Sequence, residues 1–248
     1  MSSLIEAPFY ATMEAMERHD FVKLCAASAA APALPSAAQS AGLVAHAYPR
    51  AKLVDASRAA LRLEQLRVGV NYVFDYPFSA TPCFLLRLDH PTAGGVELKT
   101  EAGGSYRWDG GVGPDKSVVA YSAICAHKMT YPTRQVSFIG YRNDPSPVAG
   151  KGKVITCCSD RSVYDPSTGA RVVSGPAPQP LATILLEHDA KKDELFAVGT
   201  FGGEMFAEFF QKFGFRLQLE MGPGARNQVD KESVVRALES YSVQWAKC

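Results

Sequence analysis

Two short stretches are the most informative about the fold of this sequence and about the group that it binds: CAH at residues 125–127 and CCSD at residues 157–160. Each begins with a cysteine and ends with a second side chain that binds metals, a histidine in the first and an aspartate in the second. Thiolate, imidazole and carboxylate groups are all ligand types for protein-bound metals. The pattern therefore predicts one metal centre to which both stretches contribute.

The residues after the second stretch make the pattern more specific. SVYDP occupies residues 162–166, and GPAP occupies residues 175–178. This order resembles the Rieske family of iron–sulfur proteins, in which two cysteines hold one iron and two histidines hold the other. The resemblance implies a [2Fe–2S] cluster with four ligands, Cys125, His127, Cys157 and Asp160, in which Asp160 takes the place of the second histidine.

The same resemblance implies roles for residues around the centre. In the family, a serine hydroxyl and a tyrosine hydroxyl donate hydrogen bonds to the sulfur atoms and raise the reduction potential. Ser162 and Tyr164 stand at those positions. A proline loop covers the cluster in the family, and Pro176 and Pro178 match that loop.

The six cysteines leave one question about the ligands open. Many high-potential Rieske proteins have a disulfide that braces the two ligand loops, but Thr130 and Ser159 occupy its positions here. Cys158 is an alternative fourth ligand if the loop register shifts by one residue. Otherwise we interpret three cysteines as small apolar packing residues: Cys25, Cys83 and Cys158.

A narrower resemblance precedes the first ligand. GGVGPD at residues 110–115, VVAYS at residues 118–122 and FDYP at residues 74–77 are similar to the Rieske small subunit of arsenite oxidase and its relatives. The likeness covers roughly residues 66–200. It implies an electron-transfer subunit that passes electrons between a larger, molybdopterin-containing catalytic oxidoreductase subunit and a c-type cytochrome, with any membrane association made through the complex.

Two other functions remain as alternatives. One is the Rieske subunit of a quinol-oxidising cytochrome bc-type complex, although quinol oxidation uses the histidine that Asp160 replaces. The other is a structural subunit without a cluster, in which Asp160 pairs with Arg161. The sequence has no pocket motif, so we expect no independent catalytic site, and the substrate of the complex is not predictable.

Length and charge exclude several classes. A chain of 248 residues with five histidines is too short for a ring-hydroxylating oxygenase subunit, and its histidines form no pair suited to a second iron. The net charge is +1, without a basic stripe that has interleaved aromatic residues. Nucleic-acid binding is therefore not expected.

The hydrophobic pattern predicts an all-β domain. Short apolar runs separated by turn residues indicate an antiparallel β-sandwich or barrel of the Rieske type over residues 51–200, with a cluster-binding part at about residues 120–180. Residues 50–65 suggest a linker that leads into this domain. The last part, residues 201–248, predicts a helical extension.

Two amphipathic helices are expected in that extension. The first places Phe206, Phe209, Phe210 and Phe213 on one face and ends at Gly214. We expect this face to be buried, against the chain's own sheet or against a partner. The second helix is expected over residues 229–245.

The first fifty residues resemble an export signal or an arm. Residues 18–23, RHDFVK, resemble the twin-arginine motif with its second arginine replaced by His19. Residues 24–45 are uncharged and rich in alanine, but their prolines argue against a transmembrane helix. These features favour a periplasmic location, with a cytoplasmic location as the alternative.

Overall fold

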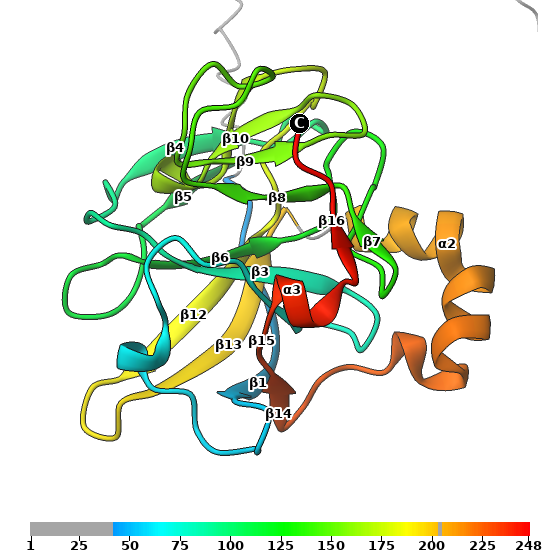
Figure 1. The fold of residues 1–248 in the computed structure, drawn as a ribbon. Coiled ribbons are helices and arrows are strands. Elements are labelled where there is room, and N and C mark those ends of the chain that lie inside the picture. Colours follow the sequence, from blue (N-terminus) through cyan, green and yellow to red (C-terminus); the bar gives the residue numbers. More distant parts are fainter. Residues whose placement is uncertain (1–41, 203–204) are drawn as a thin grey trace, which may run out of the picture. The chain divides into compact units, whose positions relative to one another are not determined.

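The computed structural model describes residues 42–202 and 205–248, which form mainly β-strands (Figure 1). The strands are β1 (His46–Val54), β2 (Tyr72–Asp75), β3 (Pro82–Arg87), β4 (Val96–Lys99), β5 (Ser105–Trp108), β6 (Val118–Ser122), β7 (Val136–Ser137), β8 (Ile139–Arg142), β9 (Val154–Cys157), β10 (Val163–Asp165), β11 (Arg171–Ser174), β12 (Thr183–Asp189), β13 (Glu194–Phe201), β14 (Glu232–Val234), β15 (Arg236–Ala237) and β16 (Gln244–Trp245). The helical elements are α2 (Met205–Met221), α3 (Leu238–Tyr241) and the short 3-10 turns η1 (Leu63–Gln65), η2 (Pro166–Thr168) and η3 (Pro223–Arg226). The predicted all-β class is confirmed.

Some expectations fall on residues that the structure does not describe. The motif at residues 18–23 lies outside the described part, and so does nearly all of the alanine-rich stretch at residues 24–45. Among the described residues, no helix has both the length and the apolar character needed to cross a membrane.

The larger sheet is a nearly closed barrel. Its eight strands run in the order β14-β1-β13-β12-β6-β3-β2-β15. The strands at its two ends, β14 and β15, are separated in the chain by Val235 alone. The two edges must therefore lie beside each other, which closes most of the barrel and leaves little unpaired edge.

Strand β1 corrects the expected linker at residues 50–65. Residues 51–54 pair with β13 or β14, the two neighbours of β1, so they lie inside the barrel sheet. Ala51 and Leu53 are fully buried, whereas Arg50 and Lys52, which alternate with them, form ion pairs with Glu187 on β12 and Glu194 on β13. The alternation of small or apolar residues with charged ones is the period-two signal of a strand.

Strand β6 joins the barrel to the rest of the core. Alternate side chains of a strand point to opposite faces. Val118 and Ala120 therefore enter a hydrophobic cluster shared with α2, whereas Val119 and Tyr121 enter a second cluster shared with the smaller sheet. Every residue of β6 is buried as a result.

The smaller sheet carries the second predicted ligand stretch. Its four antiparallel strands run in the order β11-β10-β9-β8, and it lies beside the barrel in Figure 1. Cys125 follows β6 of the barrel, whereas Cys157 ends β9 of the smaller sheet. Both cysteines belong to the second hydrophobic cluster, so the candidate centre lies at the junction of the two sheets.

Helix α2 confirms the predicted phenylalanine face. Phe206, Phe209 and Phe210 are buried, and Phe213 is partly buried against the same cluster. The ring of Phe209 lies 5.0 Å from that of Tyr131, in the segment after the first ligand stretch. The face therefore packs against this chain's own core. The helix passes through Gly214 and ends at Met221, because Leu217 adds another buried turn.

The expected second helix over residues 229–245 is wrong. This segment forms β14, β15, the single turn α3 and β16. Its apolar residues at helical spacing are buried by different partners: Val235 in the barrel cluster and Leu238 in the second cluster. Such a segment forms strands along the unpaired edges of the barrel, because each added strand provides hydrogen-bond partners for a row of backbone N–H and C=O groups.

Truncating the phenylalanine face should destabilise the whole domain. Phe209→Ala removes a fully buried ring from between Tyr131 and Phe210, and we expect the free energy of unfolding to fall by roughly 3–5 kcal/mol. Phe215→Ala on the exposed side of α2 is the matched control, and its effect should stay within about 0.5 kcal/mol. Urea unfolding curves of the two variants measure this difference, and equal midpoints would contradict the packing described.

Candidate metal centre

The two ligand loops, residues 125–130 and 157–162, have the same backbone construction. The N–H of the first cysteine donates a hydrogen bond to the carbonyl five residues later, from Cys125 to Thr130 and from Cys157 to Ser162, at 2.8 Å in both loops. The N–H four residues ahead donates back to the cysteine carbonyl, at 2.9 Å in the first loop and 2.8 Å in the second. The residue at that fourth place is left-handed in both, with φ of +58° at Met129 and +66° at Arg161. Two matching tight loops therefore present their cysteines and the side chains that follow.

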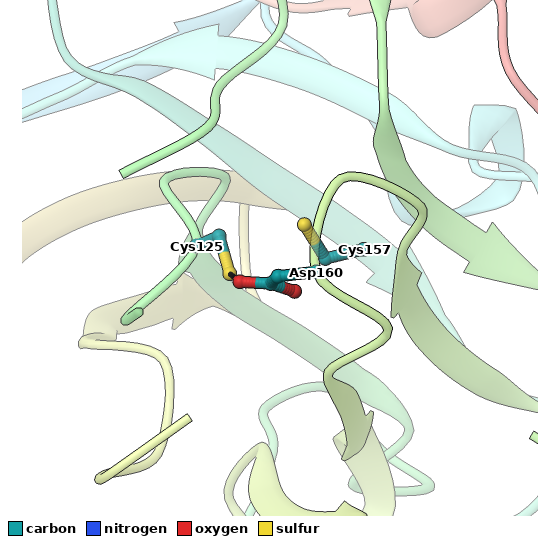
Figure 2. Close-up of side chains that lie close together, drawn as sticks. All are labelled: Cys125, Cys157 and Asp160. Carbon is teal, nitrogen blue, oxygen red and sulfur yellow. Dashed lines mark hydrogen bonds between the residues drawn. The ribbon is translucent and has the colours of Figure 1, made fainter. Parts of the chain in front are cut away.

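The four predicted ligands are brought together by these loops. The donor atoms of Cys125, Cys157 and Asp160 all lie within 4.8 Å of one another (Figure 2). Asp160 Oδ2 is 3.1 Å from Cys125 Sγ and 3.1 Å from His127 Nδ1. Two sulfur atoms and one carboxylate thus lie together, and the imidazole of His127 contacts the carboxylate.

The ligands differ sharply in exposure. Cys125 and Cys157 are fully buried, and the Asp160 side chain is 1% exposed. The His127 side chain is 36% exposed. A group held here would be sealed on the cysteine side and would reach solvent through the imidazole of His127.

The charges at the site favour a bound cation. Burial raises the pKa of Asp160, but hydrogen bonds from the Ser162 N–H and the Cys125 thiol outweigh burial and lower it overall. The hydrogen bond with the Cys157 thiol lowers the pKa of Cys125, against the opposing effect of burial, and raises the pKa of Cys157. A buried carboxylate beside a thiol with a lowered pKa is stabilised when a positive ion lies between them.

Two hydroxyl groups lie at the candidate centre, one beside a sulfur atom and the other near the carboxylate. The Tyr164 hydroxyl is 3.2 Å from Cys125 Sγ and accepts a hydrogen bond from the Ala126 N–H. The Ser162 hydroxyl is buried near the Asp160 carboxylate, but it has no hydrogen-bond partner among the described residues. Buried hydroxyls without partners are uncommon. An acceptor atom from a bound group would satisfy this one.

The proline loop packs directly against the second ligand loop. Gly175 has φ of +91°, and a Cβ there would lie 2.5 Å from the Arg161 carbonyl oxygen. Only glycine permits this close approach. Pro176 and Pro178, which follow, are both exposed. The loop therefore forms part of the surface beside the centre.

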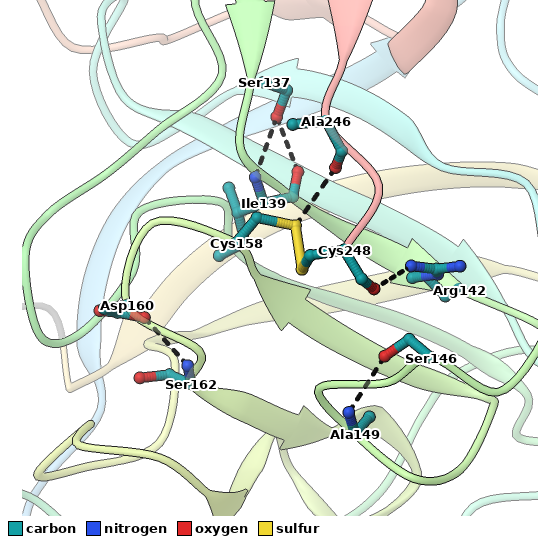
Figure 3. The surroundings of a disulfide bond; sticks show 10 residues. All are labelled: Ser137, Ile139, Arg142, Ser146, Ala149, Cys158, Asp160, Ser162, Ala246 and Cys248. Carbon is teal, nitrogen blue, oxygen red and sulfur yellow. Dashed lines mark hydrogen bonds between the residues drawn. A yellow bond between two sulfur atoms is a disulfide. The ribbon is translucent and has the colours of Figure 1, made fainter.

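Cys158 is not a metal ligand in this structure. It forms a disulfide with Cys248, across a Cα–Cα distance of 5.6 Å (Figure 3). Its interpretation as a packing residue is therefore wrong, and the alternative ligand set that used it has no free sulfur atom. Cys83 is buried and donates from its thiol to the Tyr76 carbonyl oxygen, as expected for a packing residue.

The comparisons with known proteins give a partial likeness. No family model matches the chain. Among solved structures, the chain is similar to the soluble domain of the Rieske protein II (soxF) from Sulfolobus acidocaldarius. The two are 27% identical, with a TM-score of 0.43, over 62% of this chain and 78% of that chain. We base the assignment of the centre on the two loops and the donor atoms described above.

Proposed function

We propose that this chain is a single-electron carrier that holds a Rieske-type [2Fe–2S] cluster through Cys125, His127, Cys157 and Asp160. The observation that carries the proposal is the pair of matching loops, which bring two buried thiols and one buried carboxylate together, with the exposed imidazole of His127 in contact with the carboxylate. The partnerless hydroxyl of Ser162 and the Tyr164 hydroxyl beside Cys125 support the fit.

Each residue would have a distinct part in this function. The cofactor, when bound, would supply iron that accepts and releases one electron. Cys125 and Cys157 would fix its buried end and exclude water from it. His127 would provide the exposed edge through which a partner exchanges electrons, because it alone among the four ligands reaches solvent appreciably.

Asp160 would set the potential lower than in a centre with two histidines. Two ferric ions and two sulfides carry +2, which two thiolates cancel, so a ligating carboxylate leaves a net charge of −1. An added negative charge disfavours the uptake of an electron. The same substitution weighs against quinol oxidation, which uses the histidine missing at this position.

The partners and location that we propose follow the resemblance of the sequence. The carrier would serve a larger catalytic oxidoreductase subunit, of the molybdopterin-containing kind, and would deliver electrons to a c-type cytochrome. The disulfide between Cys158 and Cys248 supports an oxidising compartment such as the periplasm, because such bonds are rare in the cytosol.

A potentiometric titration of the anaerobically purified protein tests the function. We expect one reversible one-electron step, near or below about −150 mV, which is the lower end of the range for centres with two histidines. A protein that shows no step between about −700 and +450 mV, the range of iron–sulfur proteins, would overturn the proposal.

A further inference from the structure

The last seven residues form a strap beside the centre. We call residues 242–248 the C-terminal strap. Its strand β16 runs parallel to β7, in the segment that leaves the first ligand loop. One side-chain and three backbone hydrogen bonds of 2.6–3.0 Å attach it there. They join Ser242 to Thr133, Val243 to Arg134, Gln244 to Gln135 and Ala246 to Ser137.

The far end of the strap is bonded to the second ligand loop. Cys248 forms its disulfide with Cys158, the residue directly after the ligand Cys157 (Figure 3). The Arg142 side chain donates a hydrogen bond to the Cys248 carbonyl oxygen. Trp245 lies on β8 at Gly140, where a Cβ would approach the indole nitrogen to 2.7 Å. The close fit at Gly140 shows that Trp245 of the strap packs onto β8 of the smaller sheet.

The strap therefore connects the segment that leaves the first ligand loop to the second ligand loop. The first ligand loop follows β6 of the barrel, whereas the second connects β9 to β10 of the smaller sheet. The Cys158 N–H also donates a hydrogen bond to the carbonyl of Phe138, which lies between β7 and β8, at 2.7 Å. The disulfide adds a covalent link at the same residue, between positions 90 residues apart in the chain.

We propose that the C-terminal strap, through the Cys158–Cys248 disulfide, is a positioning element that holds Cys157 and Asp160 in register with Cys125 and His127. The inference rests on the proposed function for the nature of the group that the loops hold. The physical reason is that a cross-link next to a ligand removes the conformations in which that loop moves away from the other. Ligands held in place before binding retain a metal group more firmly.

The test compares hydrogen–deuterium exchange of the full-length, metal-free protein with and without the disulfide. In Cys158→Ser/Cys248→Ser, we expect exchange at residues 157–162 to quicken on the order of tenfold or more. Both cysteines are replaced so that no free thiol remains beside Cys157. Leu53→Ala, in the buried interior of β1, is the control that lowers stability without touching the strap, and its ligand loops should exchange as in the wild type.

Reduction of the wild type provides a second route to the same state. A small dithiol reduces the disulfide to two thiols and is itself oxidised to a cyclic disulfide, with transfer of two electrons and two protons. Exchange at residues 157–162 should quicken after reduction and should return to its first rate after reoxidation. In protein that contains iron, the variant should also release iron to a chelator faster than the wild type and should show a broadened redox step.

The outcomes separate this inference from the proposed function. Faster exchange confined to residues 242–248, or an equal increase at residues 157–162 in Leu53→Ala, would overturn the positioning role. The exchange measurement needs no cofactor, so a wild-type protein without iron would refute the proposed function and leave this test intact.

Discussion

Replacement of Cys125 by serine is expected to lower the iron content from about two atoms per chain to nearly none, with loss of the visible absorption. Cys125 is fully buried, and its sulfur lies within 4.8 Å of the other sulfur and of the Asp160 carboxylate. A serine hydroxyl is a poor substitute for a thiolate ligand to iron. Cys157→Ser should have the same effect, because both sulfur atoms hold the same buried end.

The matched control for this loss is Cys83→Ser. Cys83 is also fully buried and reduced, but it belongs to the cluster shared with α2 rather than to that of Cys125 and Cys157, and it donates to the Tyr76 carbonyl oxygen, a bond that serine can keep. It should retain the iron of the wild type. If Cys125→Ser also kept a full complement of iron, the centre would lie elsewhere and the assignment of ligands would fail.

Asp160→His is expected to raise the midpoint potential by on the order of 100 mV or more. The size follows from a comparison of ligand sets. Exchange of two thiolates for two histidines separates plant-type ferredoxins, at about −400 mV, from Rieske centres, at about −150 to +300 mV. Removal of one anionic ligand should give about half of that difference. The redox titration described above measures it directly.

Asp165→Asn is the control for charge alone. Asp165 stands five residues further along and accepts a hydrogen bond from the Ser167 N–H, which asparagine can also accept. It removes the same charge without changing a ligand, so its potential should shift far less than that of Asp160→His. If both variants kept the wild-type potential with the cluster intact, Asp160 would lie outside the coordination sphere.

The sequence was sufficient to predict which residues converge. Cysteines followed at once by a second donor lie on tight loops, because the ligands must curl toward one point, and both loops have that form. The buried face of α2 was also predictable. Four phenylalanines recur at helical spacing, and such an apolar face packs against the core: Phe206, Phe209, Phe210 and Phe213. The form of each loop and the apolar face of α2 depend on residues close together in the chain.

The strands near the two ends of the described chain were not predictable in the same way. β14 and β15 close the barrel by pairing with β1 and β2, which lie far away in sequence. Local spacing in residues 229–245 favours a helix, and the free barrel edges override it. β1 itself was missed because Arg50 and Lys52 resemble a solvated linker until their partner strands are known.

The disulfide shows a third limit. Cys158 stands next to the predicted ligand Cys157, and the sequence was interpreted as giving it either a packing role or the role of an alternative ligand. Its partner Cys248 is the last residue of the sequence given and belongs to no motif. Only the pairing of β16 with β7 brings the strap to the second ligand loop. The sequence did contain one signal for this disulfide, because Cys158 and Cys248 are cysteines outside the predicted ligand set.

Chemical analysis of iron and acid-labile sulfide in the anaerobically purified full-length protein tests the central claim most directly. We predict about two iron atoms and about two sulfides per chain, as a [2Fe–2S] cluster requires. A protein without iron, or one with a single zinc ion and no sulfide at the same four ligands, would contradict the claim.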